Sequence, residues 1–352
     1  MAESVLYYSD TIVAMRCGPL YGPCRLHEGR RPPGQRERRR TAIKRLTSIL
    51  CLVLLLGALW LARPAGPEVP GLAAPVGAKN QDLTAIDPLH RREAVPLHLS
   101  ITWERGAKLS AAGLTLADLV GESDVFHDRH ALNDLQAIDD NLRWMLSRSE
   151  TTISLSLGPN AIDSASAETL MQNYLDGIRH YIEQGYNAVS CSYRASTGMV
   201  TLSFSSGVYS GSNLTAARTG AMNAAIELHD RLWREGTLRA TMDQSDIAWV
   251  YYTWLAKNCA YDSKAAASSP SHTAYGLFQF GQAVCDGYTA AYNLLLKLEG
   301  IPCTTYSVND HIWTVAELDG RTVHSDATWG DQGSYVAYQY FGMTEAKALS
   351  RF

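Results

Sequence analysis

Three side chains that can act together in nucleophilic catalysis follow one another towards the end of the chain. They are Cys285, His311 and Asp326. A cysteine thiolate attacks carbonyl carbon, an imidazole takes the thiol proton, and a carboxylate fixes the tautomer of the imidazole and stabilises its charged form. Residues of these types in this order predict acyl transfer through a thioester. Each also has a structural alternative: a small buried thiol, a hydrogen-bonded core imidazole, and the cap of a following turn.

The element that carries the cysteine is predicted to be a helix from Ala283 to Glu299. Its apolar positions recur at intervals of three and four residues, and Gly300 follows as a C-terminal stop. Cys285 then lies in the first turn, where unpaired N–H groups and partial positive charge stabilise a thiolate and lower its pKa. The same N–H groups can hold the oxyanion that forms when the thiol attacks a carbonyl.

The histidine and the aspartate are predicted to lie on a hairpin. Two apolar segments flank Asp319-Gly320, a dipeptide suited to a two-residue turn because glycine tolerates positive φ. If that turn sets the register, His311 and Asp326 share one face as diagonal neighbours, about 7 Å apart. His324 falls on the same face and is the competing base, two residues further from the centre of the site.

Five short motifs stand in order in this region. They are SHTAYG from Ser271, VCDGYTAAY from Val284, GIPC from Gly300, HIW from His311 and DATW from Asp326. In this combination they resemble the transglutaminase-like superfamily of papain-type cysteine enzymes, in particular its bacterial members, over residues 247–343. The resemblance implies a papain-like core with the cysteine helix packed on an antiparallel sheet. It also implies that Cys285 is the nucleophile, His311 the base and Asp326 the orienting acid.

The chain departs from the pattern of that superfamily in three places. Asp286 follows the cysteine where glutamine is often found, Ile312 replaces a small residue, and Thr314 stands where asparagine is frequent. None of these removes a member of the triad, but all three bear on substrate fit. The resemblance also implies an oxyanion-binding side chain upstream of the cysteine. Gln282 is the first candidate and Gln279 the second, with a solvent-facing amide as the alternative for each.

The composition is that of an ordinary globular protein, with 46% apolar and 19% charged residues over 352 positions. This length suits two folded domains with additional segments. No two of the seven cysteines lie two to four residues apart, so we expect neither a zinc site nor a disulfide lattice. A single disulfide between Cys259 and Cys303 is an alternative. We expect no metal or other cofactor.

A basic segment and an apolar segment stand at the start of the chain. Arginines crowd residues 25–45 between prolines, which predicts a disordered tail over residues 1–45. Residues 46–62 form an apolar run of 17 residues, which as a helix spans about 26 Å. Because the basic side is N-terminal, we predict a transmembrane signal anchor with the tail in the cytoplasm and the later domains outside the cell. A cleaved signal peptide, giving a secreted protein, is the alternative.

The charge balance supports this division and bears on partners. The first 63 residues hold 11 Lys and Arg against 4 Asp and Glu, and the remainder holds 20 against 31. With this excess of acidic residues, residues 64–352 lack the positive charge that binds the phosphates of nucleic acid. We therefore expect protein or peptide substrates, including cell-surface or cell-wall material. A nucleic-acid role for the arginine tail is an alternative that requires residues 46–62 not to cross the membrane.

The predicted fold class is α+β. A linker over residues 63–94 precedes an accessory α+β domain over residues 95–240 and a transglutaminase-like domain over residues 241–352. The predicted function is that of a membrane-anchored cysteine enzyme for thioester-mediated acyl transfer on protein or peptide amides. Water as the second substrate gives proteolysis or deamidation, and an amine gives cross-linking. The alternative is a catalytically silent peptide- or wall-binding module on the same scaffold.

Overall fold

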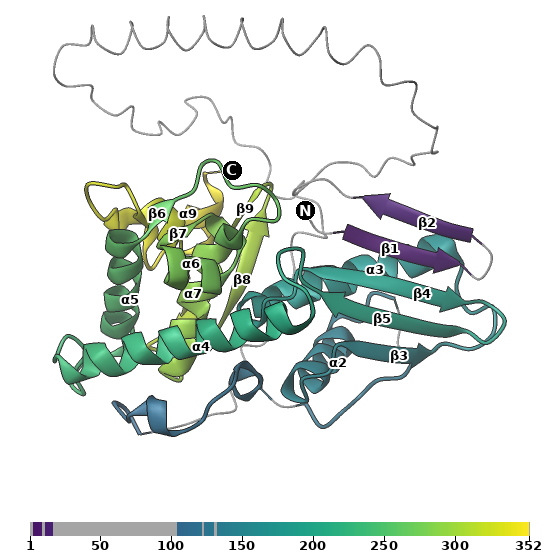
Figure 1. Cartoon of the computed structure of the whole chain (residues 1–352), viewed down its shortest axis with the longest axis horizontal. Coiled ribbons are helices and arrows are strands. Elements are labelled where there is room, and N and C mark those ends of the chain that lie inside the picture. The colour runs from purple at the N-terminus through teal and green to yellow at the C-terminus, as the bar shows by residue number, and fades with distance from the viewer. Residues whose placement is uncertain (1–2, 9–10, 17–103, 122, 130–131, 352) are drawn as a thin grey trace, which may run out of the picture. The chain divides into compact units, whose positions relative to one another are not determined.

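Three segments in which apolar and polar residues alternate form a five-stranded sheet together with an N-terminal hairpin. The computed structural model describes residues 3–8, 11–16, 104–121, 123–129 and 132–351. The strand order of the sheet is β2-β1-β4-β5-β3 (Figure 1), with β1 parallel to β4 and the other neighbours antiparallel. The strands are β1 (Glu3–Tyr8), β2 (Thr11–Arg16), β3 (Thr152–Ser156), β4 (Ala188–Arg194) and β5 (Met199–Ser205).

The β1–β2 hairpin lies within residues 1–45, where the sequence predicts a disordered tail. The arginine crowding behind that prediction begins only at Arg25, whereas ESVLYY and TIVAMR are rich in β-branched and aromatic residues, which favour strands. Residues 17–45, the predicted anchor at 46–62 and the predicted linker at 63–94 lie outside the described residues. Within the described part of the chain, no helix has both the length and the apolarity needed to cross a membrane.

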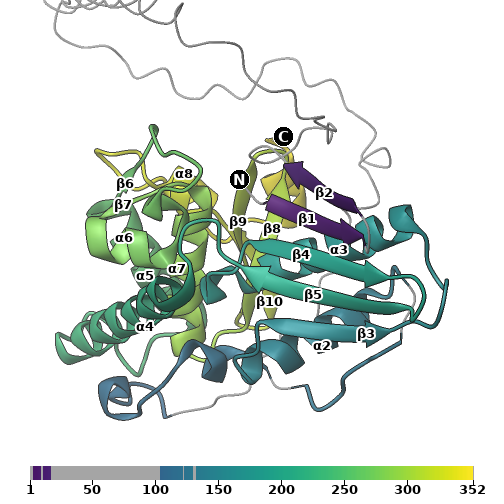
Figure 2. The ribbon, with the colours of Figure 1, turned by 45° about the vertical axis from the view of Figure 1, so that its right-hand side comes forward.

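Two amphipathic helices cover one face of this sheet (Figure 2). They are α2 (Leu135–Ser147) and α3 (Ser164–Ile178), and each begins at an aspartate whose carboxylate accepts a backbone N–H of the first turn. Leu142, Tyr174 and Val189, from α2, α3 and β4, are completely buried in the core between helices and sheet. Cys191 on β4 is also buried there, so it is a packing residue, as its alternation with apolar neighbours suggests.

The C-terminal part is built around the helix that carries Cys285. Its helices are α4 (Gly211–Arg234), α5 (Gln244–Asn258), α6 (Ala274–Phe280), α7 (Cys285–Leu298), α8 (Ala327–Gly330) and α9 (Glu345–Leu349). Its strands are β6 (Ala260–Tyr261), β7 (Gln282–Ala283), β8 (Cys303–Val308), β9 (His311–Leu318) and β10 (Arg321–Ser325). Short 3-10 helices are η2 (Leu109–Ala111), η3 (Leu116–Leu119), η4 (Arg179–Gln184), η5 (Pro270–His272) and η6 (Tyr338–Tyr340). The main sheet is antiparallel, in the order β10-β9-β8, and β6 pairs with β7 in a separate two-stranded sheet.

The hairpin register predicted from Asp319-Gly320 is confirmed. Both residues have positive φ, of 52° and 74°, which a two-residue turn of this hand requires. Arg321 pairs with Leu318, and the pairing continues to Ser325 opposite Thr314. Asp326 follows directly at the end of β10, so the register carries it back towards the start of β9.

The buried side chains form two main clusters. One lies between α2, α3 and the five-stranded sheet, and the other gathers α4, α5, α7, β9 and residues 109–119. By core membership α4 therefore goes with the C-terminal part, whereas the sequence suggests a boundary between residues 240 and 241. A buried ion pair of 2.5 Å between Lys297 on α7 and Glu183 on η4 connects the two parts at the end of the cysteine helix.

Candidate active site

Cys285 is the first residue of α7, as predicted. The helix follows Val284 in extended conformation, and this preceding residue provides no side-chain cap, although Asp286 Oδ1 accepts the backbone N–H of Gly287 at 3.0 Å. The N–H groups before Gly287 are directed at the region in front of the sulfur, where an oxyanion can accept them. The cysteine itself is 6% exposed.

His311 and Asp326 form the hydrogen bond that the predicted register allows. His311 Nε2 lies 2.7 Å from Asp326 Oδ2, and the two side chains are 13% and 4% exposed. Because a carboxylate accepts, Nε2 carries the proton and Nδ1, on the other edge of the ring, is the nitrogen that can exchange a proton with a thiol. The other oxygen of Asp326 accepts the backbone N–H of Trp329 at 3.0 Å. Asp326 is therefore held from both sides.

Thr289 joins the nucleophile helix to the strand of the histidine. Its hydroxyl lies 2.8 Å from the carbonyl oxygen of Cys285 and 3.1 Å from that of Ile312, and its side chain is buried. On the same side, Cys285 Sγ lies 4.0 Å from the carbonyl oxygen of Asp310, the residue before His311. These contacts bring the thiol to the backbone that carries the imidazole.

Burial dominates the electrostatics of the nucleophile. It raises the pKa of the Cys285 thiol to about 12, and the neighbouring Asp286 carboxylate raises it further, while the backbone N–H groups of Ile312 and Asp286 act in the opposite direction. The helix N-terminus alone suggested a lowered pKa, but it does not outweigh desolvation in this site. The thiol is thus protonated at rest, and its reaction needs a group that takes the proton.

Two tryptophans hold the imidazole of His311. The rings of His311 and Trp329 stack at 5.2 Å between centroids, and those of His311 and Trp313 at 5.9 Å. Trp313 is almost fully buried and belongs to a small cluster with Met343, whereas Trp329 is partly exposed. The ring is therefore restrained in its plane, and Trp329 is the one of the two that a substrate can contact.

His324, the competing base, has a structural role. It is 4% exposed, and its Nδ1 accepts the indole N–H of Trp313 at 2.9 Å. Burial lowers the pKa of His324 to about 4. The ring is neutral at physiological pH and its Nδ1 lone pair is occupied, so His311 is the histidine positioned for proton transfer.

The candidate oxyanion side chain, Gln282, occupies an exposed position on β7, opposite Ala260. The contacts of the described residues do not join it to Cys285, and its role stays a prediction. Asp243 caps α5 by accepting the backbone N–H of Asp246 at 2.7 Å. Cys259 and Cys303 are both free thiols, so the alternative of a disulfide between them is not realised.

A pair of residues beside the nucleophile was not predicted. His272 Nδ1 lies 2.8 Å from Asp286 Oδ2. His272 stood out in the sequence only as part of SHTAYG, and Asp286 only as a departure from the family pattern. A carboxylate directly after Cys285 opposes ionisation of the thiol, and this was the signal in the sequence that a compensating group could lie nearby.

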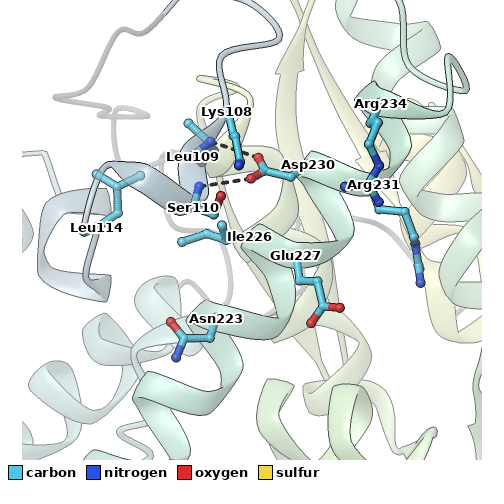
Figure 3. Close-up of a pocket in the computed structure, with 11 residues that line it drawn as sticks. Lys108, Leu109, Ser110, Leu114, Asn223, Ile226, Glu227, Asp230, Arg231 and Arg234 are labelled. Atoms are coloured by element: carbon cyan, nitrogen blue, oxygen red, sulfur yellow. Dashed lines mark hydrogen bonds between the residues drawn. The ribbon is translucent and has the colours of Figure 1, made fainter.

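A cavity of about 440 Å³ lies elsewhere, between η2 and the end of α4 (Figure 3). Asp230 closes one side by accepting the backbone N–H groups of Leu109 and Ser110 at 2.9 and 3.0 Å. Lys108, Arg231 and Arg234 also line it, whereas the triad does not. Within the residues that the structure describes, no group of three or more His, Cys, Asp or Glu side chains is arranged to hold a metal ion.

Comparison with known proteins gives a family match for part of the chain. The model of the transglutaminase-like superfamily matches residues 232–331. This segment contains Cys285, His311 and Asp326, and it is the transglutaminase-like domain of the chain. No curated protein sequence matches significantly. A solved structure, "Crystal structure of a TGase", is similar with 11% sequence identity and a TM-score of 0.29, over 59% of this chain and 57% of that one. The chain thus spans little more than half of the length of that protein.

Proposed function

We propose that this protein is a cysteine enzyme that transfers acyl groups of protein or peptide amides through a thioester on Cys285. The observation that carries the proposal is the hydrogen bond of 2.7 Å between His311 Nε2 and Asp326 Oδ2. The residue before His311, Asp310, contacts the Cys285 sulfur at the start of α7 through its carbonyl oxygen. The transglutaminase-like domain at residues 232–331 supports an activity of the cysteine protease or acyltransferase type.

The geometry suggests a reaction in two halves. His311 Nδ1 takes the thiol proton as Cys285 Sγ attacks the amide carbon, and the first N–H groups of α7 hold the developing oxyanion. The tetrahedral intermediate collapses, the C–N bond breaks, and His311 gives the proton to the departing nitrogen. Water or an amine then attacks the thioester, again losing its proton to His311, and the thiol returns. Asp326 keeps the imidazole in the required tautomer throughout.

The first test compares three thiols in the full-length protein, of which Cys285 and Cys303 are buried and Cys259 is half-buried. Burial raises the pKa of Cys259, Cys285 and Cys303 to about 12 in each case, but only for Cys285 do we propose a histidine–carboxylate pair that takes the thiol proton. We expect iodoacetamide to modify Cys285 faster than the other two at pH 7, as measured for each cysteine peptide by mass spectrometry. His311→Ala should slow Cys285 by about tenfold or more and leave Cys259 and Cys303 unchanged.

A second test establishes turnover. Glutamine-containing peptides are incubated with the protein in the presence and absence of a fluorescent primary amine, and ammonia, cleaved peptide and labelled peptide are quantified. Ammonia or cleavage without label indicates hydrolysis, and label indicates cross-linking. Equal alkylation of all three cysteines, together with no product, would favour the silent binding module, for which the burial of Cys285 is the supporting observation.

Location at the membrane, with the C-terminal domains outside the cytoplasm and cell-surface protein as substrate, is the second part of the proposal. It rests on the apolar run at residues 46–62 and on the charge difference across it. If residues 46–62 cross the membrane once, β1 lies in the cytoplasm and β4 lies outside it. The two strands then cannot form the pairing described above. Reporters fused to each terminus distinguish the arrangements: opposite sides support the anchor, and the same side supports the paired sheet.

A further inference from the structure

A second histidine–carboxylate pair adjoins the nucleophile. Asp286 is the residue after Cys285 and lies in the first turn of α7. Its Oδ2 lies 2.8 Å from His272 Nδ1, and the two side chains are 21% and 19% exposed. Neither residue takes part in the steps described above. Asp286 nonetheless acts on the charge of the Cys285 thiol, and His272 is bonded to Asp286.

The backbone fixes the position of His272 relative to Cys285. The residue ends η5, and the N–H of Val284, directly before the cysteine, donates to the carbonyl of Ser271 at 3.0 Å. A Cβ atom at Gly287 would clash with the same carbonyl group, so only glycine permits this close approach of η5 to α7. The imidazole of His272 is thus held against the first turn of α7.

Several charged groups of the described residues act on the pair and on the sulfur beside it. After burial, the Asp286 carboxylate is the largest cause that raises the pKa of Cys285. Its hydrogen bond, in turn, is the main cause that raises the pKa of His272. From the preceding loop, Asp262 also faces His272, with Lys264 beyond it, and Asp262 accepts a hydrogen bond from Ser271 at 2.6 Å. Tyr261 on β6 contributes a phenol, which is neutral at physiological pH because burial and nearby negative charge raise its pKa.

We propose that His272 and Asp286 are a positioning pair that sets the charge beside Cys285, compensated when His272 is protonated and negative when it is not. With the imidazolium present, the carboxylate is neutralised and the sulfur can become an anion at lower cost. When His272 loses its proton, Asp286 opposes the attacking thiolate. The inference rests on the proposed function, and it adds a second histidine that controls the pH range of the same nucleophile.

The proposal predicts the shape of a rate profile. The logarithm of the rate of iodoacetamide alkylation of Cys285 in the full-length protein, plotted against pH, should show an inflection where His272 titrates. Above it the rate should lag behind the extrapolated low-pH branch by about 3- to 10-fold, the effect expected of one unit charge on a neighbouring, partly exposed side chain at an effective dielectric constant of about 40 to 80. The profile of His311→Ala, which lacks the proposed proton acceptor, serves as the reference.

Two substitutions should act in opposite directions. His272→Asn keeps a hydrogen-bond donor for Asp286 but no charge, so its profile should lose the inflection and follow the slow branch at all pH values. Asp286→Asn removes the opposing charge, so it should raise the rate at alkaline pH and move the inflection of His272 to lower pH. Asp262→Asn is the matched control, because it removes a carboxylate that faces His272 but bonds Ser271 rather than the imidazole. It should move the inflection of His272 slightly to lower pH and leave the alkylation rate on either side of it within about twofold.

The outcomes separate the two proposals. A merely structural role for the pair would lower the rate in both variants and leave the profile unchanged in shape, which would overturn this inference. If His272→Asn does not fold, as judged by its thermal unfolding, the Asp286→Asn profile decides alone, because a lowered rate there contradicts the inference. Loss of reactivity in His311→Ala with unchanged profiles in both pair variants leaves the proposed function standing. Unchanged reactivity in His311→Ala overturns the proposed function first.

Discussion

Asp326 bonds His311 with one carboxylate oxygen and the backbone N–H of Trp329 with the other, at 2.7 and 3.0 Å. It begins the short helix α8, so the same side chain caps a helix and orients an imidazole. The sequence offered these roles as alternatives. The structure combines them, because a carboxylate has two oxygens and the end of β10 places one on each side. The cap holds the carboxylate in place, and the carboxylate holds the imidazole.

Asp326→Asn separates the two roles. The amide oxygen can still cap α8 by accepting the N–H of Trp329, but the amide N–H₂ group then faces Nε2 of His311. This favours the tautomer with the proton on Nδ1, which cannot take the thiol proton. We expect the rate of product formation to fall on the order of 10³-fold with little change in the unfolding temperature, measured by a turnover assay and thermal unfolding.

Asp326→Ala is the matched comparison. It removes the cap as well, so it should lose activity to a similar extent and also lose about 1 kcal/mol of stability. Equal activity in Asp326→Asn and the unsubstituted protein would contradict the assignment of Asp326.

Thr289 links the nucleophile to the strand of the base. Thr289→Val keeps the shape but leaves the carbonyl groups of Cys285 and Ile312 without this donor, at distances that were 2.8 and 3.1 Å. We expect a loss of stability of about 1–2 kcal/mol and a drop of about tenfold in the alkylation rate of Cys285 as the thiol loses its fixed position relative to His311. Urea unfolding and the alkylation assay measure the two effects.

Thr289→Ser retains the hydroxyl and is the control. It should recover most of the alkylation rate, even though a lost methyl group in the core lowers stability. A serine variant as slow as the valine variant would show that packing, rather than the hydrogen bonds, positions the cysteine.

Local signals explain why much of the site was predictable. The cysteine helix follows from apolar periodicity, and the pairing of β9 and β10 follows from Asp319-Gly320, whose φ values are both positive. A hairpin with a known turn has one register, and one register puts His311 and Asp326 on one face. The helix and the hairpin each involve residues that are close together in the sequence. Sequence patterns are therefore sufficient to infer them.

The remainder depends on contacts between distant segments. The thiol pKa reflects burial by the whole domain, which outweighs the helix N-terminus. The His272–Asp286 pair requires η5 to pack on α7, and the role of His324 requires Trp313 to reach its Nδ1. The β1–β2 hairpin differs from the predicted disordered tail because the arginine-rich composition that indicates disorder is confined to residues 25–45 and does not describe residues 3–16. Residue type gives the candidates, but only the packing distinguishes a buried histidine from a reactive one.

The buried ion pair at the far end of α7 gives a stability prediction. Lys297 Nζ lies 2.5 Å from Glu183 Oε1, the side chains are 3% and 0% exposed, and the other oxygen of Glu183 has no hydrogen-bond partner in the described part of the chain. Lys297→Met should therefore leave an isolated buried carboxylate and cost about 3–5 kcal/mol of unfolding free energy. Chemical unfolding in urea measures this loss.

The double variant Lys297→Met with Glu183→Leu removes both charges. We expect it to be clearly more stable than Lys297→Met alone, since no uncompensated charge stays buried. If the double variant is as unstable as the single one, the cost comes from packing around Tyr181, whose ring lies 5.4 Å from Lys297 Nζ, and not from charge.

We predict that the folded protein loses stability in acid because of the buried imidazole of His324. Its pKa is lowered to about 4 by burial, against about 6.5 in the unfolded chain. The unfolded state therefore binds more protons between these values, so the contribution of His324 is fully present above pH 6.5 and is lost as the pH falls towards 4. The stability lost in this way amounts to about 2 kcal/mol at pH 5. Protonation of Nδ1 would also break the bond from Trp313.

The measurement compares urea unfolding of the unsubstituted protein and His324→Gln at pH 7.5 and pH 5. Glutamine keeps an acceptor for the Trp313 indole N–H but does not titrate, so the variant should lose less stability than the unsubstituted protein between the two pH values, by about 2 kcal/mol. His272 contributes in the opposite sense, because its raised pKa gives stability that is present in acid and is lost as the pH rises through that value. It is common to both proteins, so the difference between them isolates His324. Parallel pH dependences in the two proteins would show that this histidine is not held neutral by its burial.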